Sequence, residues 1–63
     1  MSIPDRIAAA VAENPGGRVI ALSEAAEIDS ADFWSHVGVC VRQGTVRQER
    51  GANAGWHFYP VPR

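Results

Sequence analysis

The apolar residues of this chain change their spacing at Gly44, and this change restricts the folds that are open to it. From about Ala31 to Gln43 they recur at helical spacing, which predicts an amphipathic helix. Its expected core side comprises Phe33, Trp34, Val37, Cys40 and Val41. Gly44 is placed to end this helix in the left-handed conformation. The alternating residues that follow favour strands.

Two strands joined by a glycine-rich turn are expected in the last third of the chain. Thr45 to Arg50 forms the first and Trp56 to Tyr59 the second, with Gly51 to Gly55 between them. Alternation places Trp56 and Phe58 on one face of the second strand. The sequence therefore predicts a β-hairpin.

The first half of the chain predicts two further helices and a short strand. Ser2 is placed to cap a first helix, which the run 14–17 (Asn-Pro-Gly-Gly) ends. Residues 18–21 are rich in β-branched side chains and predict a single short strand. Ser23 is then expected to cap a short second helix over about Glu24 to Glu27, and Asp29 or Ser30 to cap the third.

The formal net charge of -1 conceals an uneven distribution. Residues 1–32 carry six acidic side chains against two arginines, whereas residues 33–63 carry four arginines against one glutamate. All six basic residues are arginine, whose planar guanidinium makes two-pronged contacts with phosphate and guanine. Such asymmetry indicates either a surface for a polyanion or two ordinary solvated surfaces.

Length and composition exclude several classes of protein. A chain of 63 residues supports one small domain over residues 1–63 and argues against a large enzyme with a deep cleft. With one cysteine no internal disulfide can form, so a cytoplasmic location is expected. No apolar run is long enough to span a membrane, and no membrane partner is expected. The opening methionine predicts a complete chain that one module uses up, leaving no ligand-sensing domain.

The expected order of helix, short strand, helix, helix and hairpin is an α+β arrangement that resembles a small winged helix-turn-helix domain. The resemblance includes a local pattern of bacterial regulators, in which an apolar residue, three spacers and a glycine precede the wing. Here Cys40 takes the usual leucine position, Gly44 is the glycine and Val46 opens the wing. The likeness covers about residues 20–61 and implies double-stranded DNA as partner, with helix 31–43 in the major groove and wing 46–59 on the backbone.

The resemblance and the residue types together predict a DNA-contacting set on the third helix and the wing. The set comprises Ser30, Ser35, His36, Val39, Arg42, Gln43, Arg47 and Arg50. The three arginines are expected on phosphates, Ser30 on a phosphate at its helix N-terminus, and the others on base edges. One check is whether the three arginines share a continuous surface.

The sequence departs from the winged-helix pattern in one respect. The exposed side of the third helix carries a single arginine, Arg42, and acidic Asp32 lies near its N-terminal end, where it repels phosphate. With so few phosphate contacts a single copy should bind weakly. A homodimer or a partner protein would then be needed for specificity.

A protein-binding winged helix remains a second hypothesis. Small, mildly acidic chains of this size are typical of phage-encoded modulators such as anti-CRISPR inhibitors. The acidic second helix and Trp34 or Trp56 could form the contact surface. Tryptophans of a small domain more often belong to its core. Catalysis, a metal site and a cofactor are not expected, because His36 and Cys40 are only two zinc ligands of four and no carboxylate is placed to orient His36.

Overall fold

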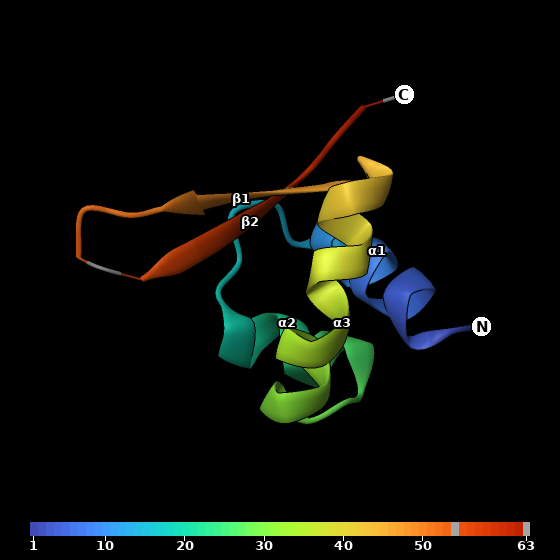
Figure 1. Cartoon of the computed structure of the whole chain (residues 1–63). Coiled ribbons are helices and arrows are strands. Elements are labelled where there is room, and N and C mark those ends of the chain that lie inside the picture. The colour runs from blue at the N-terminus through green and yellow to red at the C-terminus, as the bar shows by residue number, and fades with distance from the viewer. Residues whose placement is uncertain (54, 63) are drawn as a thin grey trace.

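The computed structural model describes residues 1–53 and 55–62, and Figure 1 shows its helices packed together with a hairpin projecting from them. The elements are α1 (Ile3–Glu13), α2 (Val19–Ala26), α3 (Ser30–Gln43), β1 (Val46–Arg50) and β2 (Trp56–Pro60). Ala54 of the predicted turn and Arg63 of the basic half lie outside the described residues.

α1 begins and ends as the sequence predicts. The Ser2 hydroxyl accepts a hydrogen bond from the backbone N–H of Asp5 at 3.2 Å, which satisfies one of the free donors at the helix start. At the other end the Asn14 amide donates to a carbonyl of the last turn at 3.0 Å. Ile7 and Val11, four residues apart, are fully buried, so one side of α1 faces the core.

The predicted strand at residues 18–21 is wrong, and so is the predicted start of the second helix. α2 begins at Val19, and Ser23 therefore lies inside the helix instead of capping it. Strand-like pairing before α2 is confined to a one-residue bridge at Gly17. A helix here buries Leu22 and Ala26 on one face, and this packing outweighs the local strand preference of the β-branched pair.

α3 matches the predicted helix to within one residue at each end. The Asp29 carboxylate accepts from the backbone N–H of Asp32 at 2.8 Å, and Gly44 ends the helix with φ +76°. Two of the five expected core residues are not buried, because Trp34 is 46% exposed and Val41 36% exposed. At 100° per residue they lie about 100° and 80° around the helix from buried Phe33, at the edge of the narrow face that this small core covers.

The hairpin has the predicted alternation. β1 and β2 pair antiparallel, with Val46 opposite Pro60 and Arg50 opposite Trp56. Val46 and Phe58 are buried against the helices, and Trp56 packs on the same core.

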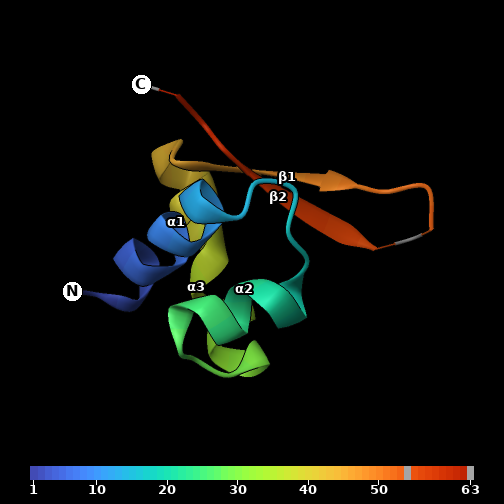
Figure 2. The same ribbon diagram turned by 180° about the vertical axis from the view of Figure 1, so that it is seen from behind.

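The loop between α1 and α2 is tied to β2. The Gly16 N–H donates to the carbonyl of Phe58 at 2.8 Å, and the Phe58 N–H donates to the carbonyl of Gly17 at 3.1 Å. Nδ1 of His57 lies 2.9 Å from the Gly16 carbonyl oxygen, so this nitrogen carries the proton and donates it. Figure 2 shows this loop passing beside the hairpin. The start of α2 is thereby held next to the wing.

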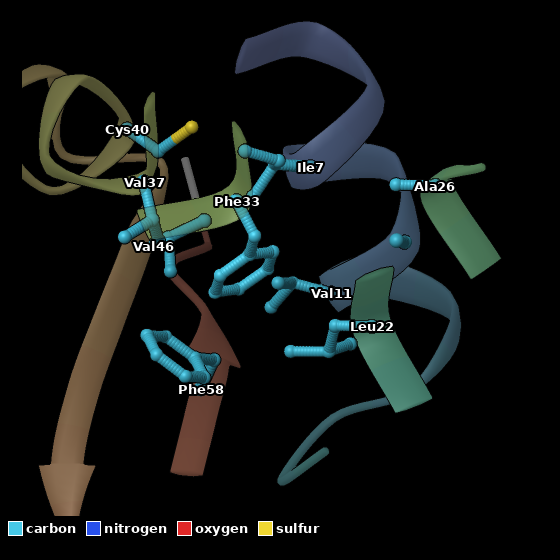
Figure 3. Close-up of a cluster of buried hydrophobic side chains, with 10 residues drawn as sticks. Ile7, Val11, Leu22, Ala26, Phe33, Val37, Cys40, Val46 and Phe58 are labelled. Carbon is cyan, nitrogen blue, oxygen red and sulfur yellow. The ribbon is translucent and has the colours of Figure 1, made fainter. Parts of the chain in front are cut away.

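Helices and strands share one core, which Figure 3 shows in close-up. Its largest buried side chains are Phe33, Phe58, Ile7, Leu22, Val11, Val46 and Cys40. The rings of Phe33 and Phe58 meet edge to face, with centroids 5.1 Å apart. This contact joins α3 to β2 and sets the position of the hairpin relative to the helix.

The glycine inside α3 and the glycine that ends this helix should respond to alanine in opposite directions. Gly38 lies inside the helix, where an added Cβ meets only Nη1 of Arg42 at 3.5 Å, so Gly38→Ala should stabilise the fold by about 0.5–1 kcal/mol. Gly44 has φ +76°, so Gly44→Ala should destabilise it by about 1–2 kcal/mol. Urea unfolding followed by circular dichroism measures both, and changes of the same sign would contradict the assigned helix end.

Candidate nucleic-acid interface

α3 has one side free to solvent, and two contacts mark its borders. On one border Trp34 packs against Phe58 of β2, with ring centroids 6.0 Å apart. On the other the Cys40 thiol donates to the carbonyl of Pro4 in α1 at 3.2 Å. The middle of the free side, by helical geometry, carries Ser35, Val39 and Arg42.

The predicted base-contacting residues are spread over this free side and one of its borders. Ser35 is exposed near the middle, and its hydroxyl donates to the carbonyl of Ala31 at 2.9 Å. His36 and Gln43 lie toward the α1 border, and Nδ1 of His36 is 2.8 Å from the carbonyl oxygen of Asp32, to which it donates. The Ser35 oxygen and Nε2 of His36 therefore remain available to an outside partner.

The basic residue of α3 lies on the middle of the free side, in its last turn. Arg42 is exposed, and its guanidinium passes close to Gly38. A cation at this position also interacts favourably with the helix dipole, which gives Arg42 a structural role as well. Ser30, the first residue of α3, is exposed at the opposite end of the helix.

The hairpin does not bring its two arginines onto one face. Arg47 and Arg50 are three residues apart in β1, so strand alternation turns them to opposite sides. Arg47 forms an ion pair with Glu49 at 2.7 Å and lies over the Tyr59 ring, 5.0 Å from its centroid. The charge of Arg47 is therefore partly neutralised by its neighbour.

Arg50 lies on the hairpin face that is turned toward α3. Its guanidinium is over the Trp56 ring, 5.6 Å from the centroid, and among the described residues it forms no ion pair. Val46 and Phe58, which are on the same face, are buried against the helices. The Arg50 side of the wing therefore faces the helices, and Trp34 on the border of α3 contacts Phe58 on this side.

Sequence reasoning missed Arg18, which it counted with the acidic half of the chain. Arg18 precedes α2 without capping it, and its guanidinium lies against Gly55, where any Cβ would overlap it. The bridge between Gly17 and Phe58 brings this arginine to the wing. No local sequence pattern around Arg18 predicts that bridge. The wing thus has a second basic neighbour from a distant part of the chain.

A groove of about 770 Å³ opens between the start of α2, α3 and the hairpin. In Figure 1, α2 and the hairpin lie on the same side of α3. The groove is mainly apolar, and its side chains include Arg18, Ile20, Glu24, Trp34, Trp56 and His57. Ile20 is 71% exposed there and leaves most of its side chain open to a partner.

The cysteine and histidines have local structural partners. Burial raises the pKa of the Cys40 thiol, so the thiol stays protonated. Its S–H group donates a hydrogen bond to the carbonyl of Pro4 in α1. Within residues 1–53 and 55–62, no three His, Cys, Asp or Glu side chains gather as metal ligands. In the same part of the chain, no helix is both long and apolar enough to cross a membrane.

Comparison with known proteins gives structural matches only. No protein-family model matches the chain, and no curated protein matches it in sequence. A MarR-family transcriptional regulator from Silicibacter pomeroyi superposes on 98% of it with a TM-score of 0.82 and 19% identity. The transcriptional regulator SlyA superposes on 95% of it with a TM-score of 0.78 and 18% identity.

The chain spans 43% of the length of each of these two structures. At such identities the likeness establishes the arrangement of the elements, in which α2 and α3 form the helix-turn-helix and β1 and β2 the wing. The chain has the winged helix-turn-helix fold.

Proposed function

We propose that this chain binds double-stranded DNA as a small transcriptional or phage regulatory factor. The observation that carries the proposal is the combined surface of α3 and the wing, where Arg42 and Arg50 are exposed and unpaired among the described residues. Its fold is shared with two solved transcriptional regulators, which supports the same use of the surface. Arg18 adds a third positive charge beside the wing.

In the proposed complex α3 lies in the major groove and the wing follows the backbone. Ser35, Val39 and Arg42 approach the bases and phosphates most closely, because they occupy the middle of the free side. Gln43 and His36 reach base edges from the α1 border, where a glutamine can pair with adenine.

Phosphate contacts come from Arg18, Arg42 and Arg50, with Ser30 donating at the start of α3. Arg47 contributes less, because Glu49 already pairs with it. Three arginines give a weak monomeric complex, so specific binding requires a second copy or a partner protein. The matched structures are more than twice as long as this chain.

Fluorescence anisotropy with a labelled random duplex at low salt tests the proposal. We expect half-saturation below about 100 µM protein, because non-specific binding has a Kd of about 1–100 µM at physiological salt and is tighter at low salt. Arg6→Ala is the matched control, because Arg6 is in α1 and its guanidinium donates to the carbonyl of Glu27, away from the wing. Absence of binding at about 100 µM would contradict the proposal.

A second function is favoured by the exposure of Ile20 and Trp34, which is typical of a protein-binding surface. The chain would then act as a phage-encoded modulator, in the manner of an anti-CRISPR inhibitor. A pull-down from nuclease-treated host lysate tests this function. A partner that survives nuclease and is lost with Ile20→Ser would support it, and loss of every partner on nuclease treatment would contradict it.

A further inference from the structure

The groove beside the wing contains both tryptophans of the chain. Trp34 enters it from α3 and Trp56 from β2, and Ile20 completes an apolar wall at the start of α2. Trp34 is 46% exposed, although its ring also contacts Phe58. Two indoles that border one open apolar space offer flat surfaces on which another ring can stack.

The charges around this groove favour an anionic occupant. Arg18 lines the groove beside Gly55. Arg50 lies over the ring of Trp56, which is itself a lining residue. Among the described lining residues the Arg18 charge is balanced by Glu24, and Arg50 over the Trp56 ring adds a further positive charge beside the groove. Stacking surfaces bordered by arginine are the combination that binds single strands of nucleic acid, where each base has an aromatic face and each linkage a negative charge.

We propose that the groove holds an unpaired base, so that the preferred ligand of this chain is DNA in which a single strand adjoins a duplex. This inference rests on the proposed DNA binding and narrows its ligand. In a duplex the base faces are covered by their neighbours and cannot stack on an indole, whereas an unpaired base exposes both faces. The α3 surface would contact the duplex while Arg18 and Arg50 hold the backbone of the strand that enters the groove.

The intrinsic fluorescence of the protein reports on this groove directly, because both of its tryptophans line it. The experiment titrates the protein with a blunt duplex and with the same duplex carrying a short thymine overhang. We expect the overhang to quench the fluorescence and to bind more tightly than the blunt duplex. Anisotropy of the labelled DNA gives the affinities independently of the tryptophans.

Substitutions separate stacking from simple folding effects. Because removing a base-stacking aromatic costs about 5- to 150-fold in affinity, Trp34→Ala should weaken overhang binding by such a factor and leave blunt-duplex binding nearly unchanged. Trp56→Phe keeps a stacking ring and should retain most of the overhang preference. Val61→Ala, which trims an exposed apolar side chain away from the groove lining, is the matched control.

The possible outcomes distinguish a failure of base binding in the groove from a failure of the proposed duplex binding. Tighter overhang binding that is lost with Trp34→Ala would support the groove as a base-binding site. Equal binding of blunt and overhang DNA, or no selective effect of Trp34→Ala, would overturn this inference and leave duplex binding standing. Loss of a nuclease-resistant protein partner with Trp34→Ala, at unchanged DNA binding, would assign the groove to a protein and also overturn it. No binding of either DNA would overturn both proposals.

Discussion

Replacing Phe58 with alanine should lower the free energy of unfolding by about 3–5 kcal/mol. Phe58 is fully buried and contacts Phe33 and Trp34, so the truncation removes the link between β2 and α3. A buried Phe→Ala change costs about 3–5 kcal/mol. A domain of this size has about 3–9 kcal/mol in total, at about 0.05–0.15 kcal/mol per residue.

Urea unfolding followed by circular dichroism measures this effect. Val61→Ala is the control, because Val61 is apolar but 36% exposed, and its removal should change the free energy of unfolding by less than about 0.5 kcal/mol. A Phe58→Ala protein that loses less than about 1.5 kcal/mol of unfolding free energy would contradict the central place of this ring in the core.

The double substitution Arg42→Ala, Arg50→Ala should weaken duplex binding by about 100-fold or more. A hydrogen bond to a charged group contributes about 1.5–3 kcal/mol, which corresponds to about tenfold or more for each arginine. Both side chains are on the surface, so the fold should be retained, and circular dichroism checks this.

Arg47→Ala is the comparison variant, and it removes one positive charge from the other face of the wing. Because Glu49 pairs with Arg47 on the opposite face of the wing, its removal should weaken duplex binding by less than about threefold. Anisotropy titrations of the three proteins at one salt concentration decide the point. A larger loss from Arg47→Ala than from the Arg42→Ala, Arg50→Ala double substitution would place the DNA on the other face of the hairpin.

Periodicity and capping residues predicted α1, α3 and the hairpin, because each is encoded within a single segment. Asp29 and Gly44 mark the ends of α3 by side-chain chemistry and backbone freedom alone. α2 was not predictable in this way. Its β-branched start favours a strand locally, and only burial of Leu22 in a core built by distant residues makes it helical.

The candidate site was only partly accessible from the sequence for a similar reason. The sequence places Arg42 on the outer side of α3. It also implies that Arg47 and Arg50, three residues apart in one strand, point to opposite faces, and the pairing of β1 with β2 shows which face each occupies. The approach of Arg18 to Gly55 depends on the bridge between the first loop and β2. The exposure of Trp34 depends on how much of α3 so small a core can cover.

The salt dependence of duplex affinity tests most directly the claim that α3 and the wing bind phosphates. If Arg18, Arg42 and Arg50 each neutralise one phosphate, log K should fall with log salt at a slope of about −2.7. The Arg42→Ala, Arg50→Ala protein should then show a slope of about −0.9, and the Arg6→Ala control should keep the parent slope. A slope that the double substitution leaves unchanged would mean that another surface holds the DNA, and would contradict the account.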